Sequence, residues 1–212
     1  MIRRFPIITE ADARQIEPGS TVELEKGGHV TPLAQDTLRA RRVTVVPAGS
    51  VDPAIPADLA PVSPVKRVVI GSDHTGVTLK ASLVAHLRKQ GIDVNDVGTN
   101  STDPVDYPDI AAAVAKSVTR RESDAGIVID GAGLGSTIAA NKIRGARACL
   151  CLNPTLARYA REHNGANVLA LGSTLMDAAE AAAIVDMFVT TPTREPRYLR
   201  RLLKVRRLEE SF

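Results

Sequence analysis

An aspartate followed by three alternating glycines is the part of this chain best suited to chemistry. The apolar run 125–129 has the character of a buried strand, and Asp130 stands at its end. Glycine lets a ligand approach the main chain closely, and a helix that starts just beyond adds unpaired N–H donors. The pattern predicts a carboxylate base beside an anion hole, with Gly131, Gly133 and Gly135 in the loop and Ser136 at the helix start.

Two plainer interpretations of this loop stay open. The loop has no GK[ST] sequence and matches the dinucleotide-binding fingerprint only in part, so a tight turn without a ligand is as consistent with it. Aspartate also commonly caps a helix or satisfies loop N–H groups, which is the structural alternative for Asp130. Ser136 is best explained as an N-cap, with a catalytic role as its alternative.

Two histidines have polar neighbours that suit them to ligand binding. Asp73 and His74 follow a second apolar run, and His163 stands directly before Asn164. An isolated histidine is more often a surface or satisfied core residue. The adjoining carboxylate and amide supply further hydrogen-bonding groups, and the motifs that contain both pairs, given below, favour a binding role for them.

Cationic side chains gather at the end of the chain. The formal net charge is only +3, and much of the excess lies in the last 20 residues. Arg197 and Arg201 are four residues apart, so they share one helical face and can hold one anion. The alternative is a solvated helix face, the usual role of a charge run. Aromatic residues make up 3% of the chain and tryptophan is absent, which argues against a stacking surface for single-stranded nucleic acid.

The elements that position these residues alternate between strand and helix from residue 66 onward. Strands are expected at 67–73, 92–98, 126–129, 146–152 and 168–171, and helices at 78–90, 107–121, 154–165, 177–190 and 194–210. This alternation predicts a Rossmann-like, doubly wound α/β fold with about five parallel strands. Ligands in such folds lie beyond the carboxyl ends of the strands, where Asp73 and Asp130 stand. Whether the far end of the His163 helix reaches that edge depends on a topology that the pattern does not give.

The first 65 residues have a different character. Residues 1–46 predict a small α+β extension, with helices after Thr9 and Thr31, a hairpin turning at Gly27-Gly28, and a short strand at 43–46. Residues 47–65 contain five prolines and predict an extended linker before the main domain at 66–212.

The remaining bulk properties favour a cytoplasmic protein. Cys149 and Cys151 are too close along the chain for an ordinary disulfide or a CxxC metal site, so we expect core thiols in a reducing compartment. The chain has no apolar run of membrane-spanning length, and its first residues lack the long apolar stretch of a signal peptide. We therefore expect no membrane partner.

Five ordered motifs resemble one family of enzymes. They are GSDHTG at 71–76, DYPD at 106–109, GxGxGSTIAANK at 131–142, REHNGANVLALG at 161–172, and the closing arginines. Together they resemble the ribose-5-phosphate isomerase type B and galactose-6-phosphate isomerase family over about residues 66–209. The resemblance implies aldose–ketose isomerisation of a phosphorylated sugar without a metal or other cofactor. It also implies a homodimer, or a dimer of dimers, with active sites shared between subunits.

The family's functional residues carry over onto matching positions. Asp73 and His74 match a pair that contacts substrate hydroxyls and phosphate, and the glycine loop matches the hole that stabilises the enediolate. His163 and Asn164 match the pair that opens the sugar ring and binds the open-chain sugar. The family's phosphate-binding arginines match Arg197 and Arg201.

The loop departs from the commonest family pattern at its two base positions. Asp130 stands where many members have cysteine, and Ser136 where others have glutamate. This combination is similar to the A subunit of galactose-6-phosphate isomerase, which works with a second subunit. Ala132 and Thr174 also replace a usual serine or threonine and a phosphate-binding arginine. The alternatives are therefore a half-site subunit that needs a heterologous partner, or a non-catalytic phosphosugar-binding protein.

A second, shorter resemblance concerns the extension. Its segment VTPLAQDTLRARRVTVV is similar to segments of enzymes from bacterial microcompartment operons, such as those for ethanolamine use. This resemblance implies association with a microcompartment through residues 1–46. The alternative is an insertion that packs on its own dimer.

Overall fold

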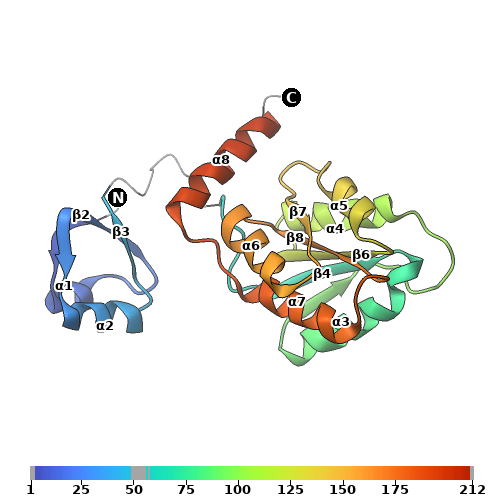
Figure 1. The fold of residues 1–212 in the computed structure, drawn as a ribbon, viewed down its shortest axis with the longest axis horizontal. Coiled ribbons are helices and arrows are strands. Elements are labelled where there is room, and N and C mark those ends of the chain that lie inside the picture. The colour runs from blue at the N-terminus through green and yellow to red at the C-terminus, as the bar shows by residue number, and fades with distance from the viewer. Residues whose placement is uncertain (1–2, 49–55, 57, 211–212) are drawn as a thin grey trace. The chain divides into compact units, whose positions relative to one another are not determined.

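The computed structural model describes residues 3–48, 56 and 58–210. The chain forms two compact units, residues 1–56 and residues 57–212, and each is described by itself (Figure 1). Within the described part of the chain, no helix is both long enough and apolar enough to cross a membrane.

The first unit is a three-stranded parallel sheet with two helices. Its elements are β1 (Arg4–Ile8), α1 (Glu10–Gln15), β2 (Thr21–Val30), α2 (Pro32–Ala40) and β3 (Thr44–Pro47), and the strand order is β1-β2-β3. Thr9 caps α1 through a capping box with Asp12, as its position before the helix predicted. The unit has its own apolar core, whose buried members are Phe5, Ile8, Ala13, Ile16, Val22, Ala34 and Leu38.

The predicted hairpin in this unit is wrong. Residues 21–30 form one strand, β2, which pairs in parallel with β1 on one side and with β3 on the other. The register moves from Phe5 opposite Leu24 to Ile7 opposite His29, so Gly27-Gly28 lies in a bulge. Two glycines permit a bulge as readily as a turn, and the crossover helices α1 and α2 impose parallel pairing.

The second unit contains the expected five-stranded parallel sheet. Its strands are β4 (Arg67–Ser72), β5 (Asp93–Asp96), β6 (Ala125–Asp130), β7 (Ala148–Leu150) and β8 (Val168–Gly172), in the order β5-β4-β6-β8-β7. After β4 a short 3-10 turn (His74–Gly76) leads into α3 (Val77–Lys89); the other helices are α4 (Tyr107–Thr119), α5 (Leu134–Ala140), α6 (Pro154–Asn164), α7 (Ala178–Thr190) and α8 (Pro196–Glu210). The predicted doubly wound α/β class is confirmed.

Helices cover both faces of this sheet (Figure 1). Along β6, Ile127 and Ile129 join one core cluster with residues of α3, α6 and α7, while Val128 joins the other with residues of α4. Every residue of β6 and β8 is buried, which explains their nearly continuous apolar sequences. The alternation of side chains between the two clusters fixes the register of the sheet.

The topology also selects the place for a ligand. The chain leaves β4 toward β5 on one side, and then returns to place β6 on the other side of β4. The connections beyond β4 and β6 therefore diverge and leave a crevice at the carboxyl ends of these two strands. Asp73, directly after β4, and Asp130, the last residue of β6, both lie at this switch point.

Within the second unit, a buried arginine fastens residues 58–65 to helix α6. Arg161 of α6 is fully buried and donates to the carbonyl oxygens of Val62 at 2.9 Å, Ala166 at 2.8 Å and Thr191 at 3.3 Å. Burial, with a smaller effect of nearby Arg147, lowers the pKa of Arg161 to about 10. The described end of the predicted linker 47–65 is thus packed against the sheet domain; residues 49–55 and 57 lie outside the described residues.

We expect the thermal stability of a truncated chain to depend on the residue at which it starts. A chain of residues 57–212 keeps the partners of Arg161, whereas a chain that starts at Val65 loses Val62 and the buried Leu59. The loss of one of the three acceptors of the buried Arg161, together with the lost apolar contact, costs about 3 kcal/mol, or roughly 5–10 °C in Tm. Thermal unfolding of both chains measures this difference, and equal Tm values would contradict it.

Candidate active site

The carboxylate of Asp130 organises the glycine loop. It is 5% exposed, and three backbone N–H groups donate to it: Ala132 at 2.9 Å and Gly133 to Oδ1, and Ser136 at 2.8 Å to Oδ2. Gly133 has φ +74°, and a Cβ there would lie 2.5 Å from Leu150 Cδ1, so only glycine fits. The loop is therefore folded around the side chain that precedes it.

This arrangement leaves one acceptor position on Asp130. A carboxylate has about four lone-pair sites, and the two on Oδ1 are filled, while Oδ2 receives a single donor. The N–H groups of Leu134 and Gly135 open α5 and so have no partner inside the helix. The site thus retains an acceptor and two donors for a ligand, fewer donors than the sequence predicted for the whole 131–136 loop.

Ser136 contributes a hydroxyl without a partner. Its side chain is fully buried, and among the described residues none is a hydrogen-bond partner of its Oγ atom. Buried hydroxyl groups are nearly always paired, so a ligand at this position would satisfy one. The N-cap of α5 is Gly133, so the predicted capping role of Ser136 is wrong.

Asp73 and His74 lie beside this loop at the end of β4. The Asp73 N–H donates to Ile129 O at 3.0 Å, which ties it to β6, and its carboxylate accepts from the N–H and hydroxyl of Thr75 at 2.9 and 2.5 Å. The Val105 N–H donates to His74 Nδ1 at 3.3 Å. A neutral His74 therefore carries its proton on Nε2, which is left as a donor.

Three residues to which the sequence assigned no site role also border the crevice; Thr174 was noted there only as a departure from the family pattern. Tyr107, the first residue of α4, packs on Gly135, where a Cβ would lie 2.6 Å from the ring. Thr174 donates through Oγ1 to Gly131 O at 2.6 Å, and the Ser173 hydroxyl lies 3.3 Å from that of Thr75. The motif that contains Tyr107 was a usable signal, whereas the neighbours of Ser173 and Thr174 depend on β8 lying next to β6.

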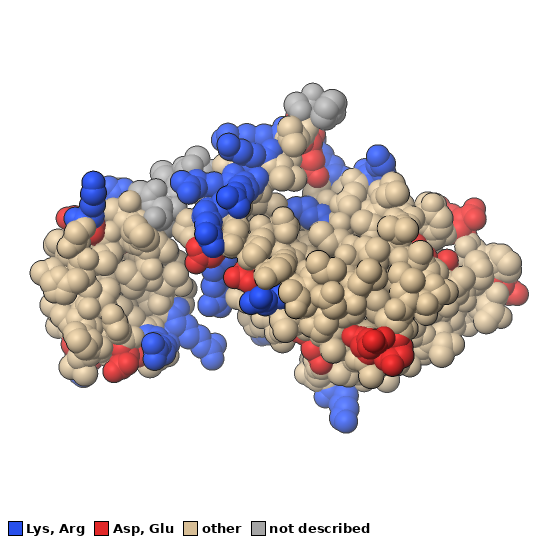
Figure 2. All heavy atoms as spheres, in the orientation of Figure 1, with Lys and Arg blue, Asp and Glu red and all other residues tan. Residues whose placement is uncertain are grey.

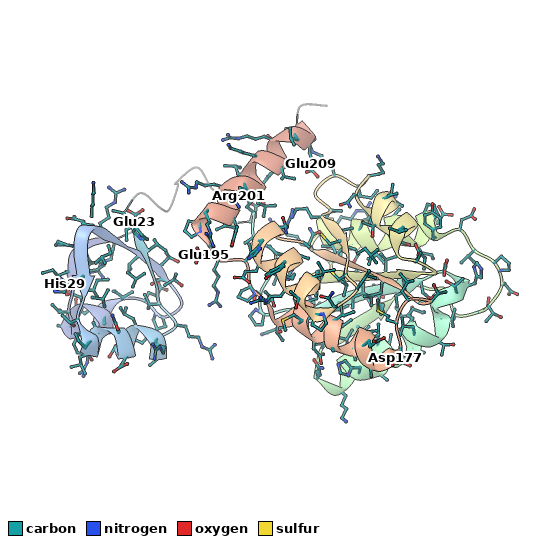
Figure 3. The ribbon with its side chains drawn as sticks, viewed as in Figure 1. Glu23, His29, Asp177, Glu195, Arg201 and Glu209 are labelled. Atoms are coloured by element: carbon teal, nitrogen blue, oxygen red, sulfur yellow. The ribbon has the colours of Figure 1, made fainter. Side chains whose placement is uncertain are left out.

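The other predicted site residues gather around Tyr198. The His163 ring stacks on Tyr159 with centroids 4.7 Å apart and packs at a tilt of 33° against Tyr198 with centroids 4.3 Å apart. The guanidinium groups of Arg197 and Arg201 lie 4.6 and 5.9 Å from the centre of the Tyr198 ring. His163, Asn164 and Arg201 line one cavity of about 630 Å³. Figure 3 labels Arg201 on α8.

These two groups lie at opposite ends of the sheet. Helix α6 starts at Pro154, beyond the carboxyl end of β7, and runs back to Asn164, four residues before β8 begins at Val168. His163 is thus near the amino ends of the strands, while Asp130 is at a carboxyl end. A strand of five residues spans roughly 15 Å, so one chain does not bring His163 to Asp130.

No group of three or more His, Cys, Asp or Glu side chains in the described ranges is arranged to hold a metal ion. Cys149 and Cys151 are free thiols; Cys151 is buried, as expected for a core thiol, and Cys149 is half-buried beside the His163 cavity. Burial raises the pKa of Cys151 to about 12, and its neighbour Cys149 acts in the same direction.

Comparison with known proteins assigns this geometry to a family. The family model described as Ribose/Galactose Isomerase matches residues 68–205, which is most of the second unit. The chain belongs to this family. The resemblance found in the sequence is confirmed, and with it the class of the protein, a sugar-phosphate isomerase.

Individual relatives agree with the ribose/galactose isomerase assignment. Ribose-5-phosphate isomerase B of Escherichia coli is 41% identical over 145 residues, which is 68% of this chain and 97% of the relative. The solved structure of the Clostridium thermocellum enzyme is 43% identical with a TM-score of 0.67, covering 68% and 98% of the two chains. The Mycoplasma genitalium enzyme, solved with bound ribulose-5-phosphate, is 39% identical with the same TM-score, covering 69% and 97%.

We expect Asp130→Asn to lower kcat by about 10²–10⁴-fold, because the variant has no base at this position. Binding of ribitol 5-phosphate, which has no carbonyl group, should stay within a few fold by calorimetry. Since Oδ1 receives two N–H groups, the side-chain oxygen of the new asparagine keeps that place and its NH₂ group replaces Oδ2. The NH₂ group then faces the Ser136 N–H, and because both groups are donors the Ser136 hydrogen bond is lost and Tm should fall.

Ser136→Ala is the matched control for this substitution. It removes a hydroxyl beside the same loop but leaves the carboxylate and its three N–H donors in place, so we expect less than about a tenfold change in kcat. Full turnover by folded Asp130→Asn would show that Asp130 is not the base and only stabilises the loop. The base would then be Ser136 or a residue of a second subunit.

Proposed function

We propose that this ribose/galactose isomerase interconverts an aldose phosphate and its ketose phosphate, with ribose 5-phosphate and ribulose 5-phosphate as the reference pair. The observation that carries the proposal is the free acceptor position on Asp130 Oδ2, beside unpaired loop N–H groups at the switch point of the sheet. The bound ribulose-5-phosphate of the Mycoplasma genitalium relative supports this choice of pair.

The proposed chemistry moves one carbon-bound proton. Asp130 Oδ2 takes the proton from C2 of the open-chain aldose, and the electron pair left behind forms the C1–C2 double bond of an enediolate. The N–H groups of Leu134 and Gly135 stabilise the negative oxygen on C1. Asp130 then returns the proton to C1 while the hydroxyl proton on C2 passes to the C1 oxygen, which leaves a ketone at C2. Ser136 Oγ is buried beside the loop and takes no part in this proton transfer.

The remaining site residues bind the sugar and open its ring. His163 transfers the ring-opening proton, and Asn164 holds the open chain. Arg197 and Arg201 bind the phosphate, for which two guanidinium groups on one helical face are well suited. Asp73 and His74 contact the hydroxyl groups from the opposite side of the crevice.

We place these two groups of residues in one site by combining two copies of the chain. Each copy has Asp130 at one end of its sheet and His163 at the other, so a second copy must supply what the first lacks. Exposed apolar side chains on α5, on α6 and just before α6 support a contact between two copies, since a monomer gains little from exposing them. They are Leu134, Ile138, Leu152, Leu156 and Tyr159.

Mixing two inactive variants tests the shared site. We expect Asp130→Asn and His163→Gln to be nearly inactive alone, and to regain activity when they are unfolded and refolded together. A random mixture contains half mixed dimers, each with one intact site of two, so about a quarter of wild-type activity should return. No recovery in dimers shown to be mixed would exclude a site shared in this way.

The wild-type control in this experiment decides the main alternative. Asp130 and Ser136 together are similar to a subunit that works with a different partner, and a half-site subunit would show no turnover as a purified homo-oligomer. Full turnover of the purified chain excludes that alternative. Tight phosphosugar binding without exchange of the C2 proton would instead indicate a phosphosugar-binding protein.

We further propose that the first unit carries an assembly or localisation contact, in a cytoplasmic protein or inside a bacterial microcompartment. Its separate core and its short resemblance to microcompartment enzymes support this role. A chain of residues 57–212 should keep its activity but no longer co-sediment with shells that retain the full chain. Equal co-sedimentation of the two chains would count against the proposal.

A further inference from the structure

Tyr198 is one of only two residues of α8 that are buried among those the structure describes, the other being Leu202. The rest of the helix is rich in exposed cations, which gather over α8 in Figure 2. Leu202 packs on Gly165 at the end of α6, where a Cβ would lie 2.5 Å from Leu202 Cδ2. Two apolar contacts therefore dock a mostly polar helix, and Tyr198 makes the one that reaches His163.

The contacts of Tyr198 join groups with different tasks. Its ring packs against the His163 imidazole at 4.3 Å with a tilt of 33° between the ring planes, and Tyr159 stacks on the same imidazole at 4.7 Å. The Tyr198 hydroxyl accepts a hydrogen bond from Arg197 Nη2 at 2.8 Å, and the Arg201 guanidinium lies 5.9 Å from the ring centre. The two ring contacts restrict the imidazole plane from both sides, and the Tyr198 hydroxyl restricts one guanidinium.

We propose that Tyr198 is a positioning residue that holds His163 and the Arg197–Arg201 pair as one unit, so that phosphate capture orients the ring-opening imidazole. The proposal rests on the roles given to His163 and the arginines under the proposed function. It adds that these roles are coupled through one aromatic ring. Neither the hydrogen bond nor the stacking can be replaced by an aliphatic side chain of similar volume.

Ribulose 5-phosphate separates ring opening from the later proton transfer. Its C5 hydroxyl carries the phosphate, so it cannot close a furanose ring on C2 and stays open. The enzyme can therefore label C1 with deuterium without opening a ring. The base removes a C1 proton, this proton exchanges for a deuteron of the D₂O solvent, and the deuteron returns to C1. Turnover of ribose 5-phosphate needs both steps, so the two measurements distinguish a misplaced His163 from a damaged Asp130 loop.

We expect two tyrosine variants to differ in these measurements. Tyr198→Phe keeps the stacking but frees Arg197, so KM for ribose 5-phosphate should rise about three- to tenfold with kcat within about twofold. Tyr198→Leu removes the ring contact on one side of His163, so kcat should fall at least about tenfold while C1 deuterium exchange stays within about threefold. Leu202→Ala is the control, because it loosens α8 and leaves the aromatic stack in place.

A structural role alone would predict a different pattern. In that case Leu202→Ala and Tyr198→Leu would lower turnover and exchange together, and this result would overturn the proposal. So would unchanged kinetics in both tyrosine variants of an active enzyme. A wild-type chain without turnover or exchange would instead contradict the proposed function.

A second measurement tests the coupling without any catalysis. Inorganic phosphate is titrated into the full chain while the His163 ring signals are followed by NMR. We expect these signals to shift in the wild type and in Tyr198→Phe, and to shift at most a third as much in Tyr198→Leu. Equal shifts in all three proteins would show that the arginines and His163 are not coupled through Tyr198.

Discussion

The site depends on the capture of three backbone N–H groups by the Asp130 carboxylate. A loop with this many glycines has high conformational entropy when unfolded, and the loop N–H groups need partners once it is buried. Asp130 supplies those partners from the end of β6, where the sheet already fixes its main chain. The same contacts leave one acceptor position on Oδ2, so a single side chain builds the loop and keeps a lone pair for chemistry.

The parallel topology imposes the second constraint on this protein. In a sheet of this kind, a helix that follows a strand must run back to the start of the next one. The end of α6 therefore lies at the amino edge of the sheet, and so do His163 and its aromatic neighbours. In the proposed mechanism, association of two chains unites them with Asp130, so oligomerisation is part of the proposed chemistry.

Buried arginines stabilise the half of the proposed site that lies around His163. Arg161 and Arg147 both donate to main-chain carbonyl oxygens, and Arg147 donates to Gly165 O at 2.7 Å just beyond the His163 turn. Burial lowers the pKa of Arg147, while the charge of Glu209 opposes that effect. Carbonyl groups that a helix end would otherwise leave unsatisfied thus receive charged donors. These hydrogen bonds fix the main chain that directly follows His163 and Asn164.

Sequence by itself determined the periodic features of this protein. Apolar runs separated by amphipathic stretches predicted five parallel strands and their helices, and the motif order identified the isomerase family, because these signals are local or linear. It failed at Gly27-Gly28, where either a bulge or a turn is compatible with the residues and the neighbouring strands decide. It could not show that Asp130 is bound by its own loop, or that Tyr198 joins His163 to the arginines. Those contacts link residues distant along the chain or depend on side-chain direction, and only the packing of α8 on α6 and of the loop on β6 sets them.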